Sequence, residues 1–466
     1  MSLKSLFSAK DMTQGSPWKR ILEFSIPMIL GNIAQQLYNT ADSVIVGIYV
    51  GDNALAAVGS ASPILNLLLA LFVGISTGAG IVVSQSFGAR DREGLSKAIG
   101  NCISLTFVAS VFIMIVGPII TRPMLNLLDT PASIIDWCES YLNIYFWGIL
   151  GFFFYNMLSG ILRGLGDSVS ALGFLLLAAA LNVVLDLVFV ASFGMGVPGV
   201  SLATVIAQAI SAVFCFIKLM KMGEHFSLNK STVKLEKAMV KRIIGIGIPS
   251  GITQAIMSMS MMVVQSLTNS LGEMVIAANV IIMRVDGFAM MPNFSFGQAL
   301  SVYTGQNVGA GKWDRVQKGV RQGSMISQTF SVVIVIVIMS LNKYLFSIFT
   351  DTEALITLAG EMMRIMAIGY IAVSITQVLG GVMRGCGDTV TPMWISIVST
   401  VVLRVPIAYI LAYFTKTAEF PNGHPFALSI SLLVSWTMGM LISVIAFRVG
   451  KTRKMIRSQM EKQLAE

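Results

Sequence analysis

Long apolar stretches alternate with short polar segments along most of this 466-residue chain. A membrane-spanning helix needs about 20 mainly apolar residues, because the hydrocarbon core of a bilayer is about 30 Å thick. Twelve stretches are long enough, and we predict spans at 21–50, 54–84, 95–120, 133–162, 169–192, 197–220, 240–271, 274–306, 316–341, 354–383, 390–414 and 424–449. The pattern therefore predicts an all-α polytopic membrane protein with twelve transmembrane helices.

A loop motif that occurs twice indicates that these spans form two copies of a six-span unit. It occurs twice, 221 positions apart, as Arg163, Gly164, Gly166 and Asp167 and again as Arg384, Gly385, Gly387 and Asp388. In such a loop, glycine supplies unusual backbone angles and aspartate caps the following helix. Two further sets of residues keep nearly the same spacing: Gln85, Gly88 and Ala89 return as Gln306, Gly309 and Ala310, and Pro27 returns as Pro249.

An even number of spans in each copy predicts two parallel six-helix repeats around a central cleft. We predict an N-lobe at 1–222, a cytoplasmic linker at 223–238 and a C-lobe at 239–466. A cleft that opens alternately to either side of the membrane is what a transporter requires.

Composition and charge support membrane insertion. Hydrophobic residues make up 55% of the chain and charged residues only 12%, about half the share in a soluble protein. With the N-terminus in the cytoplasm, 26 Lys and Arg residues fall on the inner side and three on the outer side. The net charge of +9 is therefore an orientation signal and a contact for anionic lipids, with no nucleic-acid partner implied. Both termini are predicted to be cytoplasmic.

Acidic residues inside predicted spans point to a functional site in the first copy, because buried charge is costly in a membrane. Asp42 and Asp186 lie at matched depth, about 10–12 Å below the outer surface. Asn182 lies one turn from Asp186 on the same helix face, and Thr204 reaches the same level. This set fits an oxygen-rich cation site or a carboxylate pair that shares a proton. The alternative is that each aspartate only bonds a neighbouring backbone group.

The second copy carries a different set of charges in its spans. Asp286 lies two residues from Arg284 and is expected to neutralise it locally, while Arg364 and Arg404 are interpreted as pairing groups within the lobe. Three arginines against one aspartate leave this bundle positive, which suits an anionic group. The second copy is also rich in methionine, which is typical of adaptable binding surfaces. We predict a substrate cavity lined by Met257, Met261, Met283, Asp286, Met290, Met363, Gln377, Arg284 and Tyr141.

The twelve spans, the repeated loops and Pro27 resemble the multidrug and toxic compound extrusion (MATE) family, over about residues 20–450. The acidic first lobe is similar to the prokaryotic DinF-type or MepA-type branch. The resemblance implies that Pro27 kinks helix 1. It also implies a cation-coupling site, with H⁺ or Na⁺ as the coupling ion, at Asp42, Asp186, Asn182, Thr204 and Asn156. Another branch carries acids in spans 7 and 10, but the corresponding stretches here, near Gln254–Met262 and Met362–Gln377, contain none, which argues against coupling through the second lobe.

We therefore predict a secondary active multidrug efflux antiporter, which exports amphipathic and often cationic compounds in exchange for H⁺ or Na⁺ by alternating access. A Na⁺ ion, if used, is expected at Asp42, Asn182, Asp186 and Thr204. The protein is expected to be a monomer of the plasma (inner) membrane, without enzymatic activity, resident cofactor or structural metal. The alternative is a flippase of a lipid-linked precursor in the same superfamily, which would place several arginines in the cavity.

Overall fold

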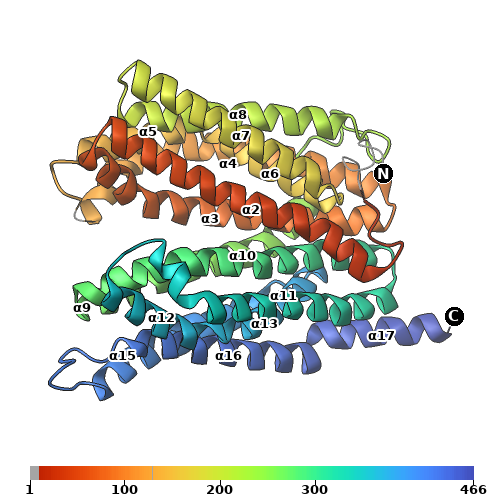
Figure 1. Ribbon diagram of the computed structural model, residues 1–466. Coiled ribbons are helices and arrows are strands. Elements are labelled where there is room, and N and C mark those ends of the chain that lie inside the picture. Colours follow the sequence, from red (N-terminus) through yellow and green to blue (C-terminus); the bar gives the residue numbers. More distant parts are fainter. Residues whose placement is uncertain (1–9, 129, 466) are drawn as a thin grey trace. The chain divides into compact units, whose positions relative to one another are not determined.

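The computed structural model describes residues 10–128 and 130–465, and this part of the chain is helical without strands (Figure 1). The first repeat contains α2 (Pro17–Tyr49), α3 (Asp52–Gly88), α4 (Arg92–Leu127), α5 (Ile135–Trp147), α6 (Ile149–Gly164), α7 (Ser168–Asp186), the π-helix η1 (Leu187–Ser192) and α8 (Val197–Met220). The second contains α9 (Lys237–Ser270), α10 (Glu273–Gly309), α11 (Trp313–Ser347), α12 (Glu353–Ala367), α13 (Gly369–Gly385), α14 (Val390–Ile397), the π-helix η2 (Val398–Leu403), α15 (Arg404–Phe414) and α16 (Phe426–Val449). A final helix, α17 (Lys451–Ala465), was not predicted. The all-α prediction is confirmed.

Nine of the described helices are long and apolar enough to cross a membrane, and two bent helix pairs raise the number to eleven. The remaining predicted span is α2, which is 33 residues long but too polar to qualify by composition. Gln35, Tyr38, Asn39 and Asp42 share one face of α2, which lines a cavity described below. Polar groups at membrane depth are tolerated where they line a cavity within the protein.

Predicted spans 4 and 10 are each broken into two helices. α5 and α6 meet at 55°, and α12 and α13 meet at 43°. The first bend lies at Gly148 and the second at Ile368, directly before Gly369. Gly148 and Gly369 occupy equivalent positions in the two repeats. A methyl group on Gly148 would lie 2.0 Å from a Val205 methyl carbon, and one on Gly369 would lie 2.5 Å from the Trp436 ring. The repeat therefore preserves a tightly packed bend.

The chain forms two compact units whose division does not follow the sequence order. Unit 1 contains the segment ending at Asp11 and Ile26–Gly251, and unit 2 contains Met12–Ser25 and Ile252–Glu466. The predicted linker at 223–238 thus lies within unit 1. Each repeat therefore contributes the start of its first helix to the unit that is built mainly from the other repeat. Within α2 and α9, Pro27 and Pro249 lie within two residues of the points where the chain passes from one unit to the other.

In unit 1, the linker and the start of α9 are held on the α3–α4 corner. The Ser227 amide donates a hydrogen bond to Ser96 Oγ at 2.9 Å, and the Glu236 amide donates one to Asn101 Oδ1 at 2.6 Å. Arg242 Nη2 donates to Gln85 Oε1 at 2.7 Å. Gln85 therefore binds the segment that leads into the second repeat.

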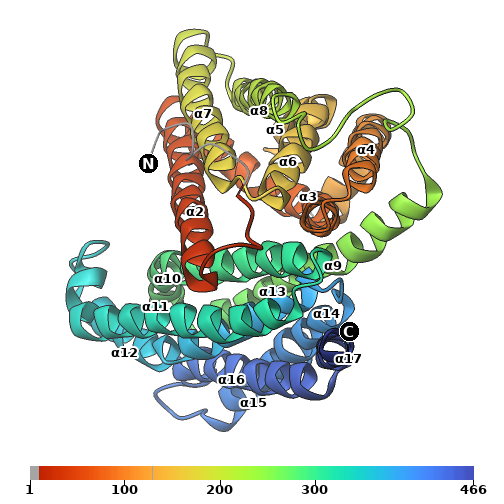
Figure 2. The ribbon, with the colours of Figure 1, turned by 90° about the vertical axis from the view of Figure 1, so that its right-hand side faces the viewer.

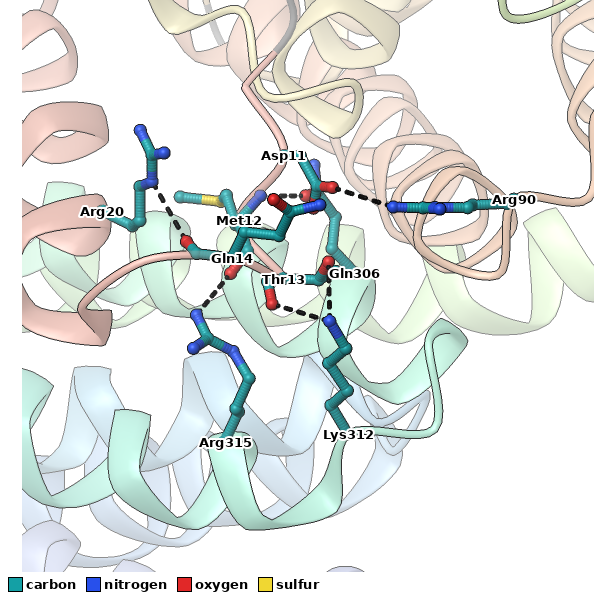
Figure 3. A network of polar contacts seen from close by, with 9 residues as sticks. All are labelled: Asp11, Met12, Thr13, Gln14, Arg20, Arg90, Gln306, Lys312 and Arg315. Atoms are coloured by element: carbon teal, nitrogen blue, oxygen red, sulfur yellow. Dashed lines mark hydrogen bonds and ion pairs between the residues drawn. The ribbon is translucent and has the colours of Figure 1, made fainter.

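In unit 2, Gln306 has the equivalent role (Figure 3). The Met12 amide donates a hydrogen bond to Gln306 Oε1 at 2.8 Å, and Met12 is buried. Lys312 Nζ donates to the Thr13 carbonyl at 3.0 Å, and Arg315 donates to the carbonyls of Met12 and Gly15 at 3.0 and 2.8 Å. The duplicated glutamine therefore anchors the entry segment of the opposite repeat in both units.

The duplicated Arg-Gly-x-Gly-Asp loops form tight turns. Gly166 and Gly387 have φ angles of 87° and 89°, which side chains rarely adopt. Asp167 Oδ1 accepts a hydrogen bond from the Ser170 amide at 2.9 Å and caps α7. Asp388 Oδ1 accepts from the Thr391 amide at 3.1 Å in the second repeat.

Unit 1 contains an unusually close contact between α3 and α9. A methyl group added to Gly74 would lie 2.2 Å from the Gly251 nitrogen, and one added to Gly78 would lie 2.6 Å from the Gly247 nitrogen. Each helix thus presents two glycines four residues apart, so the two backbones touch. α3 also packs against α4, α5, α6 and α8, and Figure 2 shows α3 and α8 nearly along their axes.

We expect Gly74→Ala and Gly247→Ala to destabilise unit 1 by about 1–3 kcal/mol, because the new methyl group meets backbone that cannot move without separating the helices. Thermal unfolding of the purified protein in detergent measures this effect. Gly245→Ala is the matched control, since its methyl group would meet nothing within 4 Å. It should be neutral or stabilise by about 0.4–1 kcal/mol. Equal melting temperatures for Gly247→Ala and Gly245→Ala would contradict the close-contact interpretation.

Candidate functional site

Unit 1 contains an open cavity of about 430 Å³ that is lined mainly by polar and aromatic side chains. They come from α2, α3, α5, α6 and α8 and include Gln35, Tyr38, Asn39, Asp42, Ser62, Asn66, Tyr141, Tyr145, Tyr155, Asn156, Thr204 and Gln208. The four α2 residues Gln35, Tyr38, Asn39 and Asp42 recur at helical spacing, so they share one face. Gln35 Nε2 donates a hydrogen bond to Asn39 Oδ1 at 3.2 Å along this face.

A pair of carboxyl groups, Asp42 and Asp186, lies at this cavity. Asp42 lines the cavity, whereas Asp186 is fully buried, with 0% of its surface exposed. Their side chains lie within hydrogen-bonding contact of each other. The Oδ1 atoms of both residues are buried without a hydrogen-bond partner in the described part of the chain. Two ionised carboxylates repel strongly at this distance, so the arrangement requires a shared proton or a bound cation.

The backbone changes from an α-helix to a π-helix directly after Asp186. Asp186 is the last residue of α7, and the chain continues directly into η1. A π-helical turn rotates the following residues away from regular α-helical register, and such turns are frequent at functional sites. Asp186 thus lies directly before the π-helical turn and contacts Asp42 of α2.

Asn182 and Thr204 complete the group. Asn182 is fully buried and donates from Nδ2 to Thr204 Oγ1 at 3.2 Å, and Thr204 Oγ1 donates to the Val200 carbonyl at 3.1 Å. With the Asn182 amide turned over, its nitrogen donates to Asp186 Oδ2 at 2.9 Å, and its oxygen accepts from the Thr204 amide and from the Thr204 hydroxyl, each at 3.2 Å. We prefer this orientation because it satisfies both amide atoms. The structure thus brings together Asp42, Asp186, Asn182 and Thr204.

Asn156 and Tyr141 also belong to this cavity. Asn156, on α6, lines it and donates from Nδ2 to the Phe152 carbonyl at 2.9 Å. Tyr141 lines the same cavity rather than the methionine-rich region of unit 2, where the sequence analysis grouped it. The sequence analysis missed Tyr38 and Gln208, although each lies one helical turn from a predicted site residue, Asp42 and Thr204 respectively.

Unit 2 contains a separate cavity of about 280 Å³. Five predicted residues line it, namely Met257, Met261, Met283, Asp286 and Met290. Arg404 and Met366 line it as well. Met363 lies outside the lining, fully buried, with its sulfur 3.6 Å from the Tyr370 hydroxyl. Gln377 also lies outside, where its backbone packs against Gly297.

Asp286 pairs differently from the sequence-based expectation. Tyr370 donates its hydroxyl hydrogen to Asp286 Oδ1 at 2.8 Å, and the nearby guanidinium that acts on Asp286 electrostatically belongs to Arg404. Arg284 is exposed and does not line the cavity. Local neutralisation of Arg284 by Asp286 is thus wrong, because residues two apart on a helix point in nearly opposite directions.

Comparison with known proteins found a matching family model and similar proteins. A family model described as MatE matches residues 27–188 and 249–410. The probable multidrug resistance protein YoeA of Bacillus subtilis is 28% identical over 428 residues, covering 90% of this chain and 92% of the relative. The probable multidrug resistance protein YpnP of the same organism is 30% identical over 399 residues, covering 85% of this chain and 89% of the relative.

Among solved structures, an outward-facing conformation of a multidrug resistance MATE family transporter of the MOP superfamily matches with a TM-score of 0.88. It is 23% identical and covers 97% of this chain and 99% of that chain. This likeness, together with the two matched halves, confirms the predicted two-repeat membrane fold.

We expect Thr204→Val to lower the apparent melting temperature in detergent, because it removes the hydroxyl that Asn182 contacts in a buried site. An unsatisfied buried polar group costs about 1–3 kcal/mol. Thr204→Ser keeps the hydroxyl and should recover much of the loss. The control is Thr77→Val, because the exposed Thr77 hydroxyl donates only to its own helix, to the Val73 carbonyl at 2.9 Å. Similar melting temperatures for both valine variants would contradict a polar network at Asn182.

Proposed function

This chain belongs to the MatE family, and on that premise we propose that it exports amphipathic, often cationic, compounds from the cell in exchange for a cation. The relatives described as probable multidrug resistance proteins support multidrug efflux, and their matches extend over most of both chains. The protein is a multi-pass membrane transporter, and its helices provide the required spans. The carboxyl pair of Asp42 and Asp186 is the single observation that carries cation coupling.

The proposed coupling site is the group formed by Asp42, Asp186, Asn182 and Thr204, with Asn156 lining the same cavity as Asp42. Asp42 is reached from the cavity, and Asp186 lies behind it, so a cation that enters the cavity meets both acids in turn. We favour H⁺ as the coupling ion because the carboxyl groups contact each other directly, which a shared proton explains. Na⁺ is the alternative, since carboxylate, amide and hydroxyl oxygens are suitable ligands for a hard cation.

Transport is proposed to proceed by alternating access, with both termini in the cytoplasm and the protein acting as a monomer in the plasma (inner) membrane. The inner-side excess of Lys and Arg supports this orientation. Pro27 interrupts the backbone hydrogen bonding of α2 close to Ile26, where the helix passes from unit 2 to unit 1. Bending there would move Tyr38 and Asp42, which lie on the same helix, and would couple proton binding to the shape of the cavity.

The lipid-linked precursor alternative is not favoured. It requires several arginines in the binding cavity, but Arg284 and Arg364 are exposed and outside the cavity lining of unit 2. Arg404 alone lines that cavity among the three arginines considered. The relatives with extended matches are described as probable multidrug resistance proteins.

We expect Asp42→Asn and Asp186→Asn each to abolish gradient-driven export of a cationic dye. A potential of 100 mV supplies about 2.3 kcal/mol per charge, enough for a dye ratio of about 50-fold if one net charge moves. In both variants, the ratio of dye concentrations on the two sides of the membrane should be about one. Ethidium transport in proteoliposomes, with equal protein incorporation, measures this. Asp351→Asn, at an exposed loop carboxylate, is the control. Wild-type transport by both site variants would refute the coupling site.

The coupling ion is tested by imposing one gradient at a time. We expect an outward H⁺ gradient at equal Na⁺ to drive ethidium into proteoliposomes, and an outward Na⁺ gradient at constant pH to have little effect. Dissipating the pH gradient with nigericin should stop transport. Transport driven equally well by Na⁺ alone at constant pH would replace H⁺ with Na⁺ at the same four residues.

A further inference from the structure

A cavity of about 230 Å³ lies where α11, α16 and α17 of unit 2 meet. α17 follows α16 after the single residue Gly450 and packs against both α11 and α16 (Figure 1). The Thr452 and Ile456 side chains of α17 are buried, and Thr452 Oγ1 donates a hydrogen bond to Asp388 Oδ2 at 3.3 Å. Packed helices therefore border this space, which we call the α17 cavity. It shares no lining residue with the methionine-lined cavity in the described part of the chain.

The α17 cavity combines two guanidinium groups with uncharged side chains. Arg321 lines it from α11, and Arg453 lines it from α17. The other lining residues are Gln317, Val320, Ser324, Phe447 and Ile456. On α11, the lining residues lie three, four and seven positions after Gln317, so they share one helix face with it. Positive charge, hydrogen-bonding groups and apolar surface thus border the same space.

Neither of these arginines has an acidic partner within residues 10–128 and 130–465. No carboxylate oxygen there lies within 4.0 Å of the Arg321 or Arg453 guanidinium, and neither guanidinium donates a hydrogen bond. Asp314, in the first turn of α11, pairs with Lys318 at 3.2 Å instead. Two unpaired positive groups at one cavity repel each other, so an anion that contacts both is favoured there.

The sequence changes from charged to apolar at the level of this cavity. No charged residue occurs on α11 between Arg321 and Lys343. None occurs on α16 from Phe426 to Phe447, and Arg448 follows directly. Basic residues at the ends of apolar spans mark the boundary between hydrocarbon and lipid headgroups. In the proposed orientation, the α17 cavity therefore lies at the headgroups of the cytoplasmic leaflet.

We infer that the α17 cavity binds the headgroup of one anionic phospholipid. Arg321 and Arg453 bind the phosphate oxygens, because a guanidinium donates two parallel hydrogen bonds to phosphate. Ser324 and Gln317 bind headgroup hydroxyls, and Phe447 contacts the start of an acyl chain. The apolar lining at the membrane boundary favours a lipid over a soluble phosphate. This inference requires neither the coupling acids of unit 1 nor multidrug transport.

Native mass spectrometry of the full-length protein in a non-ionic detergent tests this site. Dioleoyl phosphatidylglycerol and dioleoyl phosphatidylcholine are titrated separately, and the amount of protein with one bound lipid is measured. The two lipids share acyl chains and a phosphate, but the choline of the second places a positive charge beside the arginines. Wild-type protein should bind phosphatidylglycerol more tightly. Equal binding of the two lipids would overturn the inference.

We expect the double variant Arg321→Gln/Arg453→Gln to weaken phosphatidylglycerol binding by about 30-fold, because each basic residue near an anionic headgroup contributes about fivefold. The matched control is Lys454→Gln/Arg457→Gln. It removes the same charge from two exposed positions of α17 that do not line the cavity. Its binding should change by less than about threefold. Equal losses in both double variants would indicate unspecific charge attraction and contradict a headgroup site.

Thermal unfolding in the same detergent separates a lipid from a soluble phosphate. A ligand that binds only the folded state raises the melting temperature, so phosphatidylglycerol should stabilise the wild type but not Arg321→Gln/Arg453→Gln. Inorganic phosphate at the same concentration should have no effect. An equal rise with inorganic phosphate would overturn a lipid as the occupant. If the double variant does not fold, the wild-type comparison of the two lipids still decides.

Discussion

Backbone hydrogen bonding in hydrocarbon is the constraint on which this structure depends. No water is available in the bilayer core, so each crossing segment must satisfy its own amide and carbonyl groups, and only helices do so within one segment. The same constraint directs polar side chains toward protein-lined spaces. α2 illustrates both effects: it remains helical across Pro27, and its face with Gln35, Tyr38, Asn39 and Asp42 lines the cavity of unit 1.

Close packing between helices follows from the absence of a hydrophobic driving force inside the membrane. Helices associate there through backbone approach and van der Waals contact, which small residues allow. The glycines of α3 and α9 provide this contact in unit 1, and Gly148 and Gly369 allow the bends in both repeats. Entry segments held by Gln85 and Gln306 add polar contacts at the helix ends. The duplicated positions thus maintain architecture.

The residues proposed to be functional occupy positions at which the two repeats differ. Unit 1 places Asp42 against Asp186, with Asn182 and Thr204 beside them, whereas the equivalents of Asp186 and Asn182 in the second repeat are Ile407 and Leu403. Unit 2 instead places Asp286 and Arg404 around a methionine-lined cavity. Divergence after duplication therefore separates a proposed ion site from a proposed substrate site while the scaffold stays common.

The sequence by itself determined the helical class, the duplicated halves, the span positions and the acids of unit 1. These follow from hydropathy, repeat spacing and depth along single helices, which are local properties. Only the tertiary structure decided that Asp286 accepts a hydrogen bond from Tyr370, that Tyr141 belongs with Asp42, and that the entry segments are exchanged between units. Those outcomes depend on how far each helix is rotated and which distant helix it contacts. A rotation of about 100° per residue changes the partner of a side chain without changing the hydropathy of its span.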